Sequence, residues 1–69
     1  MDILTIQRKL VKMMHGLNLP YEMATITLNM LKTEEQLQEM IDYILENKDI
    51  ITDHQTLQHL AKILYGDKN

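Results

Sequence analysis

The fold of this chain is decided by one amphipathic segment near its centre. It reads Thr33-Glu34-Glu35-Gln36-Leu37-Gln38-Glu39-Met40-Ile41-Asp42-Tyr43-Ile44-Leu45-Glu46-Asn47. Thr33 takes the N-cap position of a predicted helix, and Gln36 lies three residues later, which is the spacing of a capping box. Glu34 and Glu35 place negative charge beside the positive end of the helix dipole. With Asn47 as a left-handed stop, these signals predict a helix over residues 34–46.

This helix is predicted to have one apolar face. Its apolar residues recur at spacings of three and four: Leu37, Met40, Ile41, Ile44 and Leu45. Its polar residues Gln38, Glu39, Asp42 and Glu46 take the opposite face. An apolar stripe of this kind is stable only when other elements cover it, so the rest of the chain is expected to fold against it.

A helix is predicted before this segment and another after it. At about residues 3–15, apolar positions step by threes and fours from Ile3 to Leu10, and Gly16 is a candidate left-handed terminator. At about residues 53–65, Thr52 and Gln55 repeat the capping-box spacing, and Gly66 is the candidate stop. The expected apolar stripe of this last helix is Leu57, Leu60, Ala61 and Leu64.

A further helix is predicted at about residues 20–31, beginning at Pro20, whose missing N–H is harmless in a first helical turn. Its apolar residues fall on two sides, which is typical of a helix in the middle of a bundle. A strand is the competing interpretation, because Met23 to Leu28 partly alternates and contains three β-branched residues. Such a strand would lack a partner, because the other β-like segment, residues 50–52, is very short.

The sequence therefore predicts an all-α fold, a compact bundle of four short helices in an up-down arrangement. Residues 1–66 are expected to form one helical domain, followed by a polar tail at 67–69, with the helices at 20–31 and 34–46 in the centre. Whether the last helix packs on the core or on a partner stays open. At 69 residues, the chain is near the lower size limit for a single core.

Composition narrows the classes of function. The chain has no Cys, so a disulfide framework and thiolate chemistry are excluded. No apolar run approaches the ~20 residues of a membrane span, which favours a cytoplasmic protein without membrane contact. Residues 1–32 carry four cations and two anions, whereas residues 33–69 carry three cations and eight anions. This difference in net charge between the two halves could attract the halves to each other or attract a charged partner.

Neither a metal site nor a catalytic site is expected. His54 and His59 are five residues apart, about 140° around a helix, whereas two ligands on one face need a spacing of three or four. His15 stands alone at a helix end. The sequence has no Ser or Cys nucleophile and no glycine-rich phosphate loop. We therefore expect no enzyme activity and no cofactor.

Nucleic-acid binding is the alternative function. The basic residues Arg8, Lys9 and Lys12 lie on the polar side of the first predicted helix and could contact phosphates. The helix at 34–46 is acidic, however, and cannot serve as a recognition helix that presents Arg, Lys, Asn or Gln to bases. Nucleic acid is thus a less favoured partner than protein.

The chain has six methionines, and gap-filling in a core without Phe is the favoured interpretation for Met23, Met30 and Met40. The alternative is a surface for protein partners, because flexible and polarizable side chains adapt to varied ligands. Met13 and Met14 are adjacent at the end of the first helix, so both cannot be equally buried. One of them, next to Gly16 and together with Leu17 or Leu19, is expected to form an exposed apolar spot.

Two segments, residues 6–17 and 37–45, and the Pro-led helix between them resemble the three helices of a ubiquitin-associated (UBA-like) domain. The resemblance covers about residues 6–46. In that family, the first helix ends in a Met-Gly-aromatic pattern, where this chain has His15, Gly16 and Leu17. The resemblance implies a compact three-helix core whose Gly16-Leu17 loop and third helix form a protein-binding surface.

These observations together predict a non-catalytic protein–protein interaction or regulatory module. Self-association as a homodimer is a further expectation, because four short amphipathic helices leave a small core in a monomer.

Overall fold

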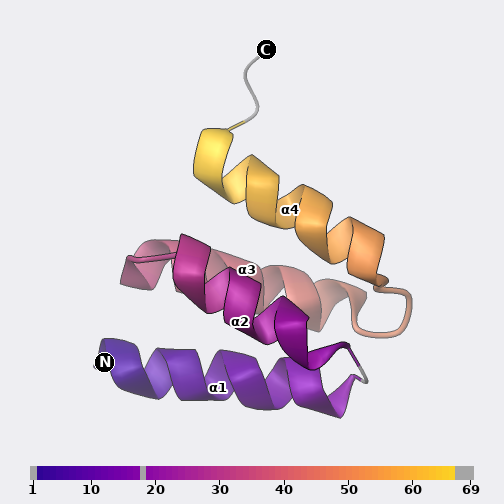
Figure 1. Ribbon diagram of the computed structural model, residues 1–69, viewed down its shortest axis with the longest axis horizontal. Coiled ribbons are helices and arrows are strands. Elements are labelled where there is room, and N and C mark those ends of the chain that lie inside the picture. Colours follow the sequence, from indigo (N-terminus) through magenta and orange to yellow (C-terminus); the bar gives the residue numbers. More distant parts are fainter. Residues whose placement is uncertain (1, 18, 67–69) are drawn as a thin grey trace.

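The computed structural model of this chain is an all-α bundle, as predicted, and it describes residues 2–17 and 19–66. The described part contains the helices α1 (Ile3–Gly16), α2 (Tyr21–Met30), α3 (Glu34–Asn47) and α4 (Asp53–Tyr65) (Figure 1). These bounds agree with the predicted ones to within one residue at each end. The predicted polar tail at 67–69 lies outside the described residues.

Both predicted capping boxes are present. At α3, the Gln36 backbone N–H donates to Thr33 Oγ1 at 3.1 Å, and the Thr33 N–H donates to Gln36 Oε1 at 3.3 Å. At α4, the Gln55 N–H donates to Thr52 Oγ1 at 3.2 Å, and the Thr52 N–H donates to Gln55 Oε1 at 3.1 Å. Since these bonds satisfy amide groups that a helix start leaves without partners, they fix where both helices begin.

Two of the predicted helix stops are wrong. Gly66 does follow α4 with a φ of 78°, but Gly16 is the last residue of α1 and its φ is not positive. Asn47 is likewise the last helical residue of α3 and is not a left-handed stop. Its side-chain Nδ2 donates to the Tyr43 carbonyl oxygen, four residues earlier, at 2.8 Å. The side-chain amide thus gives a partner to a carbonyl group in the last turn of α3.

The four helices alternate in direction. α1 and α3 run one way and α2 and α4 the other (Figure 1), which is the predicted up-down arrangement. α1 packs against α3 and α2, and α4 packs against the same two helices. Each described helix therefore borders two others, and α2 and α3 face each other across the core. As predicted, α2 and α3 are the central pair, because they lie between α1 and α4 (Figure 1), and α4 packs on the core.

The core between the helices is aliphatic. The buried apolar side chains of the helices are Ile6, Leu10 and Met14 of α1, Met23 and Ala24 of α2, Leu37, Met40, Ile41 and Ile44 of α3, and Leu60 of α4. Leu31, which lies between α2 and α3, is also buried. Four of the five residues predicted for the α3 stripe belong to this core. The fifth, Leu45, is 52% exposed, because it lies at the edge of the stripe that faces the end of α1.

The inward faces of α2 and α4 differ from the predicted ones. In α4, Thr56 is fully buried, whereas Leu57 is 42% exposed and Ala61 is exposed. In α2, Thr27 is fully buried, whereas Ile26 and Met30 are exposed. Each buried hydroxyl donates to the carbonyl four residues before it at 2.8 Å, so a threonine can face an apolar core without an unsatisfied group.

Candidate partner-binding groove

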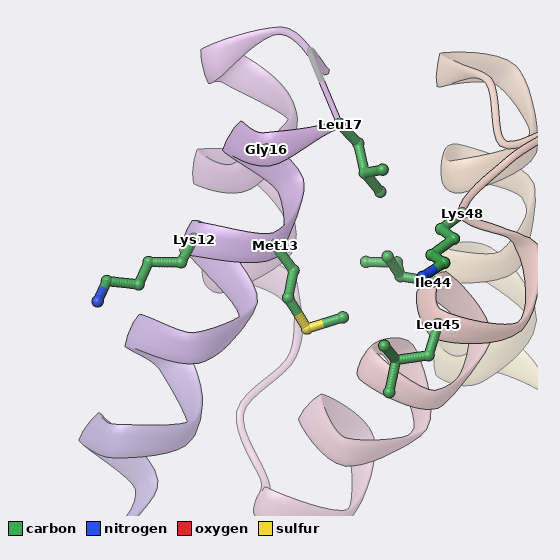
Figure 2. A pocket seen from close by; sticks show the side chains of 7 residues that line it. All are labelled: Lys12, Met13, Gly16, Leu17, Ile44, Leu45 and Lys48. Atoms are coloured by element: carbon green, nitrogen blue, oxygen red, sulfur yellow. The ribbon is translucent and has the colours of Figure 1, made fainter.

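An open apolar groove lies where the C-terminal ends of α1 and α3 come together. It encloses about 250 Å³ and is lined by Lys12, Met13, Gly16, Leu17, Ile44, Leu45 and Lys48 (Figure 2). The α1 side contributes the first four residues and the α3 side the last three. The groove is smaller than the roughly 300–1,000 Å³ typical of small-molecule and cofactor sites, so one or two anchoring side chains suit it better.

Three apolar side chains form the accessible wall of the groove. Met13 and Leu17 are half-buried and point from α1 toward α3, and Leu45 is half-exposed on the opposite side (Figure 2). Ile44, which is buried, forms the floor between them. Covering these side chains would remove apolar surface from water, which is the main source of affinity at protein interfaces.

The turn that follows α1 holds Leu17 over the groove. The N–H groups of Leu17 and Leu19 both donate to the Met14 carbonyl oxygen, at 3.2 and 3.3 Å. Met14 is itself buried and belongs to the core, so this carbonyl is a fixed acceptor. The turn is therefore anchored to the core, and Leu17 has a defined position next to α3.

Gly16 leaves the groove open. A Cβ atom added at this glycine would meet no heavy atom within 4 Å, and the backbone there is helical. Position 16 therefore does not require glycine, because a side chain has room there and the φ angle is not positive. A side chain at this position would occupy the groove that Gly16 lines, so its absence lets a ligand approach the α1 backbone closely.

Two lysines border the groove. Lys12 extends from α1 away from α3, whereas the Lys48 side chain lies over the α3 side near Ile44 (Figure 2). Both are exposed. An apolar ligand side chain flanked by carboxylates would match this arrangement, since exposed charges at the rim of an interface orient the partner.

The structure brings three of the five predicted partner-binding residues together. Met13, Gly16 and Leu17 line the groove, where Met13 and Leu17 are half-buried. Met14 does not, because it is 1% exposed and fills the core. Leu19 is half-buried beside a separate small hollow near Pro20 and Tyr21.

The sequence pattern did not indicate that residues of α3 line the groove. Ile44 and Leu45 belong to the predicted apolar stripe, and Lys48 lies beyond the predicted end of the helix at residue 46. Helical periodicity alone could not separate the edge of the stripe from its centre, because that depends on where α1 ends. The resemblance to UBA-like domains was the one signal that pointed to α3 as part of a binding surface.

The residues of the nucleic-acid alternative are all exposed on α1. Arg8 and Lys12 also border a second open hollow of about 320 Å³, between α1 and Leu28 of α2. Its apolar lining includes Leu4 and Val11. The cations are thus accessible, and apolar surface lies beside them.

The remaining candidate residues form no constellation in the described part of the chain. No group of three or more His, Cys, Asp or Glu side chains there is placed to hold a metal ion. His59 instead stacks on Tyr43, with ring centroids 3.8 Å apart, and so joins α4 to α3. None of the described helices is both long enough and apolar enough to cross a membrane.

Comparisons with protein-family models, with curated proteins and with solved structures gave no match to this chain.

Proposed function

We propose that this protein is a non-catalytic interaction module that binds a protein partner through the groove between α1 and α3. The observation that carries the proposal is the groove itself, where half-buried Met13 and Leu17 face half-exposed Leu45 across an apolar floor. An apolar anchor of the partner would fill this space and bury all three side chains.

The position of the groove agrees with the resemblance to UBA-like domains. That resemblance implies a protein-binding surface made by the Gly16-Leu17 loop and the third helix, and residues of both line the groove. The open space at Gly16 gives the same surface a physical reason to bind, because a ligand can come close to the backbone there.

Nucleic-acid binding has one supporting observation, the exposure of Arg8, Lys9 and Lys12 on α1. It is less well supported than protein binding, because the neighbouring helix α3 presents Glu35, Asp42 and other carboxylates that would repel a phosphate backbone.

Site-specific photo-crosslinking in the cells that produce this protein tests the proposal. A photoreactive phenylalanine derivative in place of Leu45, at the edge of the groove, is expected to give a covalent adduct with another polypeptide chain. The same amino acid in place of Thr25, which is exposed on α2, is the control and should give none.

A second variant links the adduct to the groove. Gly16→Leu adds a side chain whose Cβ meets no heavy atom within 4 Å, so the fold should be retained while the adduct from position 45 is lost. An adduct that survives Gly16→Leu, or equal adducts from positions 45 and 25, would refute binding in the groove.

A further inference from the structure

We propose that the occupant of the groove is a second copy of this chain, related by a two-fold axis that runs along the seam between α1 and α3. This inference rests on the proposed function, because it names the partner of the same groove. Its basis is the distribution of charge on the two helices that form the seam.

α1 and α3 carry opposite charges. Residues 3–16 contain three cations, Arg8, Lys9 and Lys12, and no carboxylate, and all three are exposed. Residues 34–47 contain five exposed carboxylates and no Lys or Arg: Glu34, Glu35, Glu39, Asp42 and Glu46. The two helices are direct neighbours, so this surface consists of a basic side and an acidic side with the groove between them.

These charges are not neutralised within one molecule. Over residues 2–17 and 19–66, no ion pair joins a cation of α1 to a carboxylate of α3. Lys12 extends away from α3 (Figure 2), which leaves its ammonium group available to a neighbouring molecule. On the acidic side, Asp42 Oδ1 accepts a hydrogen bond from Gln38 Nε2 at 3.0 Å, which leaves the negative charge in place.

Symmetry selects the orientation of the second copy. In a two-fold dimer, each subunit uses the same surface. If the axis lies in the interface and is perpendicular to the helices, α1 covers α1 of the second copy and like charges meet. If the axis runs parallel to the helices, along the seam, α1 of each copy covers α3 of the other and opposite charges meet twice.

The axial register also fits this orientation. The C-terminal turns of α1 and α3 lie side by side, because Met13 and Leu17 line the same groove as Ile44 and Lys48. Rotation about an axis parallel to the helices keeps every residue at its own level. Lys12 of one copy then lies within one helical turn of Asp42 and Glu46 of the other.

Leu45 gives the same dimer an apolar centre. It is 52% exposed and lines its own groove together with Met13 and Gly16, so it meets the groove of the second copy at the same level. Exposed ion pairs contribute little free energy each. Burial of the two Leu45 side chains therefore supplies the affinity, and the charges set the orientation.

A charge-swap experiment tests this arrangement. One variant carries Lys9→Glu and Lys12→Glu, and the other carries Asp42→Lys and Glu46→Lys. Sedimentation velocity over a dilution series should show a dimer for the unmodified chain and at least tenfold weaker association for each variant alone. An equal mixture of the two variants should associate as tightly as the unmodified chain, because opposite charges again face each other at both contacts.

Matched controls are Lys32→Glu and Glu22→Lys, which change the charge at exposed positions outside α1 and α3. They should leave association unchanged, and circular dichroism should show that every variant stays helical. The proposal is overturned by a monomer at all concentrations, by a dimer that the charge reversals do not weaken, or by a mixture that fails to associate.

The failure of this inference can be distinguished from failure of the proposed function. If the chain is monomeric while the photoreactive group at position 45 still captures a different protein, the proposed dimer is refuted. The groove then remains a binding site for another protein. If the adduct is absent as well, both proposals fail.

Discussion

The two glycines of this chain occupy opposite backbone conformations. Gly16 is helical and has open space around its Cα, whereas Gly66 has a φ of 78° and ends α4. The Gly66 N–H closes α4 by donating to the Lys62 carbonyl oxygen at 2.7 Å. Only Gly66 is therefore explained by backbone conformation.

The same substitution at these glycines should change stability in opposite directions. Gly16→Ala is expected to raise the free energy of unfolding by about 0.5 kcal/mol, because alanine loses less backbone entropy in a helix. Gly66→Ala should lower it by about 1 kcal/mol, because a Cβ is strained at positive φ. Urea denaturation of both variants checks this. A destabilising Gly16→Ala would show that glycine there has a structural role.

At the scale of single helices, the sequence predicts where each begins better than which face it buries. Thr33 and Thr52 mark the starts of α3 and α4 because a capping box is a local interaction between residues three apart. The inward face of α4 depends instead on contacts with α3 and α2, which are distant in sequence. The stack of His59 on Tyr43 is one such contact.

The orientation of α4 is consistent with that stack. With His59 on the side of Tyr43, Thr56 and Leu60 face the core, and Leu57, which has the more apolar side chain, is left half-exposed. Hydrophobicity alone favours Leu57 over Thr56, so the pattern pointed to the wrong residue. The same holds for Thr27 in α2, which is buried while Ile26 is exposed.

Truncation of leucines in α4 measures this orientation. Leu60→Ala should lower the free energy of unfolding by about 2–4 kcal/mol, because it leaves a cavity at a side chain that is 4% exposed. Leu57→Ala should cost less than about 1 kcal/mol, since that side chain is 42% exposed. Thermal or urea unfolding of the two variants gives the comparison. Equal losses would place α4 in the orientation expected from sequence.

The candidate groove was predictable in part for the same reason. Met13, Gly16 and Leu17 form a short local segment, so the sequence alone places them next to one another. The α3 side needs the packing of two helices that are about thirty residues apart in the chain. The choice between Met13 and Met14 likewise depends on the direction from α1 to the core.

At the scale of the whole molecule, the stability of this small domain depends on the α3 stripe. Leu37, Met40 and Ile41 are fully buried, and the core that they share with α1, α2 and α4 contains neither Phe nor Trp. A domain of this size has a total stability of only about 3–5 kcal/mol. One unsatisfied charge in the core is therefore enough to unfold it.

Two aspartate substitutions on α3 should separate folding from binding. Ile41→Asp, like Leu37→Asp, should abolish the cooperative unfolding transition, because a buried unpaired carboxylate costs several kcal/mol. Leu45→Asp, four residues along the same predicted stripe, should keep the helical circular dichroism signal and lose only about 1 kcal/mol, since position 45 is half-exposed.

Leu45→Asp should nevertheless lose the groove's ligand. It puts a carboxylate at the centre of the apolar contact, where each copy of the proposed dimer would have to bury it against the other. Circular dichroism melts and sedimentation velocity on the same samples report folding and association separately. A folded Ile41→Asp would mean that the α3 stripe faces water, and a folded Leu45→Asp that associates like the unmodified chain would remove Leu45 from the interface.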